Sequence, residues 1–241
     1  MSKLYKSNLI TQSTYNSLYA TGSGPGTLYG LPKIHKPNFS EVFPYRPILA
    51  AYNLASYNIS KHLVPVLSCL TSNKYTIKNS IDFAQKVSAI ENAEQYFMVS
   101  LDVENLFTNI PLQETINIIL NLLFCNSSHV IGLTKDLFKT FLQLATMNNF
   151  FIFNNKYYLQ KDGVGMGLPL GPTFANIFLC YHEIQWLSDC PKEFKPSHYF
   201  RYVDDTFVLF SNIIHANKFL EYLNSKHPLI NFTMETESRN C

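Results

Sequence analysis

The sequence predicts an α+β fold, an antiparallel sheet with helices packed on one of its faces. Three observations support this prediction. Short β-rich segments alternate with segments whose apolar residues recur at helical spacing. The 241 residues are 46% hydrophobic and 15% charged, which is enough apolar material for a large packed core. Two adjacent aspartates, Asp204 and Asp205, separate two strand-like runs and therefore indicate a hairpin.

The elements of the first hundred residues follow from local signals. Residues 1–27 form a polar N-terminal extension that ends in a glycine- and proline-rich loop. Residues 28–49 hold four closely spaced prolines and are expected to be extended and irregular. Apolar spacing then predicts helices over 52–70 and 80–89. A buried strand over 95–102 ends at Asp102.

The second half continues with clearer start and stop signals. Asn109 and Pro111 are suited to the cap and the first turn of a helix that ends near 124, and Thr134 is suited to the start of the next helix. The other expected elements are a 150–159 hairpin with an Asn-Asn turn, a glycine-rich loop, a helix over 172–187, the Asp204-Asp205 hairpin, a helix over 216–226 and an edge strand over 229–235.

The net charge of +2 hides an uneven distribution. Residues 1–90 carry a charge of +7, from nine Lys and Arg against two acidic residues, whereas residues 91–241 carry −5. A basic first part suits a polyanionic partner, and an acidic remainder suits cation binding. The alternative is that the two parts only attract each other.

Several classes of protein are not favoured. The N-terminus lacks the apolar stretch of a signal peptide, and apolar runs such as 116–124 are about half the length that spans a bilayer. The five cysteines show no CxxC spacing, which favours reduced thiols in an intracellular protein over a zinc site. We therefore expect no membrane partner.

Three aspartates are the candidates for chemistry. An Asp-Asp turn is unfavourable for a tight hairpin and brings like charges together, and a divalent cation would explain both features. If the hairpin lies beside the strand that ends at Asp102, three carboxylates meet at one sheet edge. Such oxygen ligands suit Mg²⁺, and two ions about 3.5–4 Å apart can activate a 3′-hydroxyl and stabilise a leaving pyrophosphate. The alternative is a solvated acidic turn.

These segments resemble the motifs of reverse transcriptases. Residues 101–111 are similar to the first catalytic motif of that family, Tyr202-Val203-Asp204-Asp205 to the second, and residues 160–176 to the motif between them. The blocks at 29–36, 101–111 and 231–235 more specifically resemble Penelope-like retroelement reverse transcriptases. The resemblance covers residues 28 to about 237.

The resemblance implies a right-hand polymerase fold. Its fingers would be residues 28–94, and its palm would be residues 95–241, with a finger-type insertion at about 134–170. No thumb or GIY-YIG endonuclease follows in the sequence, so the chain is expected to be a fragment of a longer open reading frame.

The resemblance also implies roles for individual residues. Asp102, Asp204 and Asp205 would be catalytic and would hold Mg²⁺, or Mn²⁺ in its place, with the backbone carbonyl of Val103. The residues expected to bind the incoming nucleotide are Lys36, Arg46, Phe107, Gln160 and Gly163. Phe107 would exclude a ribose 2′-hydroxyl, although it could instead be ordinary core. Lys33 could help to bind the triphosphate or could be a surface charge.

The function implied is an RNA-directed DNA polymerase core that adds dNTPs to a DNA primer on an RNA template, inside the cell and for this purpose in the nucleus. One alternative is a catalytically inactive, retroelement-derived protein that binds nucleic acid, which the truncation favours and the intact aspartates oppose. A telomerase-type enzyme shares the three aspartates. It is disfavoured by the block at 31–36 and by the absence of an N-terminal RNA-binding domain.

Overall fold

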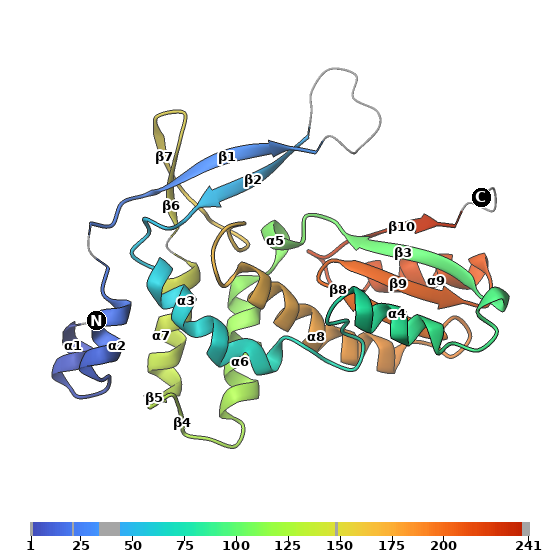
Figure 1. Ribbon diagram of the computed structural model, residues 1–241, viewed down its shortest axis with the longest axis horizontal. Coiled ribbons are helices and arrows are strands. Elements are labelled where there is room, and N and C mark those ends of the chain that lie inside the picture. Colours follow the sequence, from blue (N-terminus) through green and yellow to red (C-terminus); the bar gives the residue numbers. More distant parts are fainter. Residues whose placement is uncertain (1, 21, 34–43, 148, 238–241) are drawn as a thin grey trace. The chain divides into compact units, whose positions relative to one another are not determined.

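The structure is a computed structural model that describes residues 2–20, 22–33, 44–147 and 149–237 (Figure 1). It consists of two compact units. The first unit comprises Met1–Cys69 and Pro111–Phe174, and the second comprises Leu70–Ile110 and Ala175–Cys241. Helices and antiparallel strands confirm the predicted α+β class. The division into fingers and palm remains a prediction.

The first unit has a helical core. Its helices are α1 (Ser2–Lys6), α2 (Gln12–Leu18), α3 (Tyr57–Leu67), α6 (Leu112–Phe124) and α7 (Lys135–Thr146). Helix α7 buries Phe138, Phe141 and Leu142 almost completely, and it packs against both α3 and α6. The hydroxyl of Ser60 on α3 donates to the carbonyl of Ala145 on α7 over 3.1 Å, so the contact between these helices also contains a buried polar link.

A mixed sheet completes the first unit. Its strands are β1 (Gly26–Pro32), β2 (Tyr45–Ala50), β6 (Phe150–Phe153) and β7 (Lys156–Leu159), in the order β2-β1-β6-β7. The expectation of an irregular segment at 28–49 is therefore wrong for its described parts. Pro47 lies in β2, which is an edge strand, where a residue without an N–H is tolerated. The predicted Asn-Asn turn is confirmed, because Asn154 and Asn155 both have positive φ, at 50° and 58°.

Two further features were not predicted. The strands β4 (His129–Val130) and β5 (Leu133–Thr134) form a very short hairpin. Asn109 is not the cap of α6: it is the last residue of an extra helical turn, α5 (Leu106–Asn109), which belongs to the second unit. Pro111 is the cap residue of α6, and the Asn109 side chain donates instead to the carbonyl of Glu104.

The second unit is built on a four-stranded antiparallel sheet. Its strands are β3 (Phe97–Val103), β8 (His198–Tyr202), β9 (Asp205–Phe210) and β10 (Phe232–Thr236), in the order β10-β3-β9-β8. One face, the core face, buries Val99, Leu101 and Val208. Helix α9 (Ile213–Asn224) packs there through Phe219, whose ring lies 5.4 Å from that of Phe210.

Helix α8 (Gly171–Asp189) begins in the first unit and continues into the second, where Glu183 bonds to β8 on the core face. Helix α4 (Ser80–Ser88) lies against the opposite face, which we call the open face, and Phe83 contacts Phe200 and Phe207 there. The sequence did not predict a helix on this side (Figure 1). None of the helices in the described ranges is long and apolar enough to cross a membrane.

Candidate active site

The β8–β9 hairpin presents two aspartates at its tip. Tyr202 and Asp205 are the last paired residues, so Val203 and Asp204 form a two-residue turn, which we call the aspartate turn. Val203 has a φ of 58°, in the left-handed region. A β-branched residue rarely adopts this conformation, which costs about 1–2 kcal/mol. The turn is therefore strained and needs support from its surroundings.

The strand register brings Asp102 to the aspartate turn. Asp102 of β3 is the direct cross-strand partner of Asp205 in β9. Directly opposed residues of an antiparallel pair point to the same side of the sheet, with Cβ atoms about 4.5–5.5 Å apart. Both carboxylates therefore lie on the open face, and Asp204 precedes Asp205 in the chain. The register thus pairs two of the three aspartates that the sequence singled out, Asp102 and Asp205.

Negative charge dominates this end of the sheet. Burial raises the pKa of Asp205, and the charges of Asp204 and Glu235 raise it further. Like charges directly opposed across two strands are destabilising, so the cluster favours a compensating cation. Within the described ranges, however, no three His, Cys, Asp or Glu side chains lie close enough together to count as a metal-binding group.

A pocket of about 500 Å³ opens beside Asp205, between α4 and the open face. Its walls include the rings of Phe83, Phe200 and Phe207, and Tyr202 lies at its edge with 53% of its surface exposed. Apolar walls next to a carboxylate suit a ligand with a planar ring and a polar group, the ring between the walls and the polar group near the charge.

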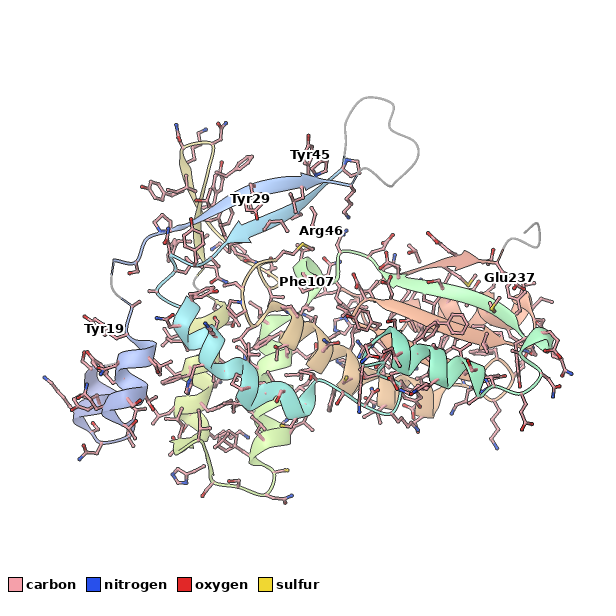
Figure 2. All side chains as sticks on the ribbon, in the orientation of Figure 1. Tyr19, Tyr29, Tyr45, Arg46, Phe107 and Glu237 are labelled. Carbon is pink, nitrogen blue, oxygen red and sulfur yellow. The ribbon has the colours of Figure 1, made fainter. Side chains whose placement is uncertain are left out.

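Phe107 lies on α5, directly after the loop that follows β3 (Figure 2). Its ring is half-buried. Asn105, the cap residue of this helix, has a left-handed φ of 49°. Two contacts fix the preceding residue, Glu104: its N–H donates to the carbonyl of Asn231 over 2.8 Å, and its carboxylate accepts from the Asn231 amide over 2.7 Å.

The other candidate residues belong to the first unit. Arg46 is exposed on β2, opposite Leu31 of β1 (Figure 2). Gln160 is half-buried and donates to the carbonyl of Asp162 over 3.0 Å, and Gly163 has a positive φ of 68°. Lys36 lies outside the described residues.

The glycine-rich loop approaches β2 very closely. The N–H of Leu49 donates to the carbonyl of Met166 over 2.7 Å. A Cβ atom on Gly167 would lie only 2.2 Å from the Leu49 carbonyl oxygen, and Gly167 has a φ of +111°. From the resemblance, Gly163 of this loop was expected to bind the incoming nucleotide. In the structure, a glycine is needed at position 167 because the loop lies directly against Leu49 of β2.

A buried ion pair beneath the aspartate turn was not predicted from the sequence. Arg201 of β8 and Glu183 of α8 are 0% and 1% exposed and form a salt bridge on the core face. The signal was present, because Arg201 occupies a core-facing position in a strand whose other core-facing residue, Tyr199, is also buried. A charged residue at such a position requires a partner.

Comparison with known proteins identifies a family. The family model for reverse transcriptase (RNA-dependent DNA polymerase) matches residues 34–236. Curated protein sequences give no match.

Solved telomerase structures share the fold. Telomerase from Candida tropicalis in complex with the TWJ fragment of telomeric RNA superposes with a TM-score of 0.62 at 13% identity, over 99% of this chain and 45% of that chain. Telomerase from Candida albicans, with the same kind of RNA fragment, gives 0.60 at 12% identity, over 99% and 47%. Apo telomerase from Candida tropicalis truncated from its C-terminal domain gives 0.61 at 13%, over 90% and 52%. The chain thus spans about half the length of these telomerases, and at such identity the likeness concerns the fold alone.

Proposed function

The chain belongs to the reverse transcriptase (RNA-dependent DNA polymerase) family, and we propose that it adds dNTPs to the 3′ end of a DNA primer paired with an RNA template. The observation that carries the proposal is the register of Asp102 with Asp205, directly beside Asp204. In the proposed site the carboxylate of Asp204 would join this pair, and three carboxylates would provide the oxygen ligands that phosphoryl transfer requires.

The donor set fits magnesium, or manganese in its place. The ligands would be Asp102, Asp204, Asp205 and the backbone carbonyl of Val103. Burial is the main cause of the raised pKa of Asp205, and the charges of Asp204 and Glu235 add a repulsion that a divalent cation would relieve. When bound, two such ions supply Lewis-acid stabilisation for the attacking and leaving oxygens.

The remaining proposed roles concern the nucleotide. Phe107 would stand against the sugar and exclude a 2′-hydroxyl, which favours a DNA product. Arg46 would bind the triphosphate with its fork of donors, helped by Lys36. Gln160 and Gly163 would lie under the incoming base.

The origin of the chain is also a proposal. The blocks at 29–36, 101–111 and 231–235 support a Penelope-like retroelement. An enzyme that copies such an element into genomic DNA acts in the nucleus, so this location is part of the proposal.

Single-nucleotide insertion at low salt tests the function. The wild-type chain is given a DNA primer on an RNA template, one complementary dNTP, and Mg²⁺ or Mn²⁺. We expect insertion by wild type, background levels with Asp205→Asn, and wild-type levels with Glu221→Gln, a control on the exposed surface of α9. Equal insertion by wild type and Asp205→Asn would contradict the proposed role of the aspartates.

A second candidate is a nucleic-acid-binding protein without catalysis. It is favoured by one observation, the lack within the described ranges of three acidic, His or Cys side chains close enough to form a metal-binding group. In that case the wild-type chain would bind the primer–template duplex and insert nothing with either metal.

A further inference from the structure

We propose that Arg201 is a positioning residue for catalysis. From the core face of the sheet it donates a hydrogen bond to the carbonyl of Val203 and thereby fixes the orientation of Asp204 and Asp205. The inference rests on the proposed function, because it assigns a role in holding the aspartates rather than in the chemistry itself. Arg201 would not touch the substrate.

The hydrogen bonds of Arg201 leave none of its donors unused. Its Nε and Nη2 donate to the two carboxylate oxygens of Glu183, and Nη2 also contacts the sulfur of Cys180 at 3.2 Å. Its Nη1 donates to Asn176 Oδ1 over 2.9 Å and to the Val203 carbonyl over 2.8 Å. A guanidinium has five N–H donors in a fixed plane, and the structure shows five contacts. These contacts fix the orientation of the guanidinium plane, and its Nη1 lies toward the turn.

The contact reaches the turn at its strained residue. Val203 is the turn residue with a left-handed φ, and its carbonyl is the acceptor. A charge-assisted hydrogen bond is stronger than one between neutral groups, so it can hold a peptide in a conformation that the residue alone would leave. Asp204 and Asp205 are the next two residues, and their orientation depends directly on that peptide.

The ion pair is itself anchored on several sides. Tyr199 and Asn73 each donate to Glu183 over 3.0 Å. The Arg201 backbone pairs with the segment before α4, through Arg201 N–H to Tyr75 and Ile77 N–H to Arg201. Burial would lower the pKa of Arg201, but the attraction and hydrogen bonds of Glu183 outweigh it and raise the pKa, so the side chain stays charged. The support under the turn is therefore rigid and permanently ionised.

Asn176 gives this support a link to the glycine-rich motif. Asn176 lies on α8, just after the glycine-rich loop and within the segment 160–176 that resembles the family motif. Its side-chain oxygen and the Val203 carbonyl both accept hydrogen bonds from Nη1 of Arg201. Its role in the structure is to orient that nitrogen. A residue of one motif thus acts on the aspartates of another through Arg201.

The test compares Arg201→Lys with Tyr222→Phe. Lysine keeps the charge but cannot reach Glu183 and the turn at once, whereas Tyr222→Phe removes a hydrogen bond to the Trp186 carbonyl elsewhere in the same unit. We expect Arg201→Lys to raise the Mg²⁺ concentration for half-maximal single-dNTP insertion about tenfold, the factor that corresponds to one charge-assisted hydrogen bond. We also expect faster amide exchange across residues 199–206. Tyr222→Phe should change neither quantity, and an unchanged Mg²⁺ dependence in Arg201→Lys would overturn the proposal.

A double variant separates positioning from stability. Arg201→Met with Glu183→Gln leaves no buried charge, so its thermal stability should exceed that of Arg201→Met alone. The turn contact is still missing, so the raised Mg²⁺ requirement should persist. Recovery of both properties would mean that Arg201 only stabilises the fold. If wild type inserts no nucleotide, the proposed function fails, but amide exchange still decides the contact: unchanged exchange over residues 199–206 in Arg201→Lys overturns it.

Discussion

Replacing Gly167 with alanine should destabilise the first unit far more than the same change at Gly132. Both glycines have positive φ, at +111° and +77°. Their surroundings differ, because a Cβ on Gly132 meets nothing within 4 Å, whereas a Cβ on Gly167 would lie 2.2 Å from the carbonyl oxygen of Leu49. The pair therefore separates backbone strain from steric exclusion.

The magnitudes follow from the contacts at each site. An alanine in the left-handed region costs about 1–2 kcal/mol, and this is the whole expected effect for Gly132→Ala. At Gly167 the alanine must also displace Leu49, which removes the 2.7 Å hydrogen bond to Met166, worth about 1 kcal/mol. The displacement further disturbs the buried cluster of Leu49, Ala51, Leu54 and Leu168, at about 1–3 kcal/mol. Gly167→Ala should cost about 3–6 kcal/mol in total.

Thermal unfolding followed by circular dichroism measures the difference. For a chain of this size each kcal/mol lowers the melting temperature by about 2–4 °C, so Gly167→Ala should melt about 6–24 °C below wild type. Gly132→Ala should melt only a few degrees lower. Amide exchange over residues 45–50 should accelerate in Gly167→Ala alone. Equal losses for the two variants would mean that the loop and β2 do not meet as described.

Three further outcomes concern the site. The pKa of Asp205 is raised by burial, Asp204 and Glu235, so its ionised form destabilises the fold above that pKa; in EDTA near pH 7, Asp205→Asn should melt about 1–4 °C higher than wild type. In thermal melts at decreasing pH, this difference in melting temperature should disappear as the Asp205 carboxyl of wild type takes up its proton. A melting temperature of Asp205→Asn below that of wild type at every pH would contradict this electrostatic argument. Phe107→Val should reduce discrimination against rNTPs about 10–200-fold in competing single-nucleotide insertions, and an unchanged ratio would make Phe107 ordinary core. Fluorescence anisotropy can measure binding to a primer–template duplex, and the logarithm of the binding constant should fall linearly with the logarithm of the salt concentration. Binding that does not depend on salt would exclude phosphate contacts as the main source of affinity.

Local signals predicted most of the helices and the tight turns. Helices expected at 80–89 and 172–187 are found at Ser80–Ser88 and Gly171–Asp189. The Asn154-Asn155 turn was predictable because asparagine tolerates the positive φ that a two-residue hairpin requires. In each case the residues that determine the structure are neighbours in the sequence.

Features that depend on distant residues were harder to predict. Pro47 argued against a strand, and only its place at a sheet edge makes β2 possible. The meeting of Asp102 with Asp205 was expected from their places at strand ends, and the register brings them together. Arg201 and Glu183 are 18 residues apart, on a strand and a helix, and no local sequence signal predicts that their side chains meet. The roles of the site residues remain proposals.

The strand order of the second unit has a consequence for synthesis on the ribosome. The partners of β3 are β9 and β10, and about 100 residues separate its end at Val103 from the start of β9 at Asp205. At about 5–20 residues per second, β3 waits roughly 5–20 s for its first partner. During that interval both edges of β3 lack their partner strands, and unpaired strand edges are a template for pairing with another chain.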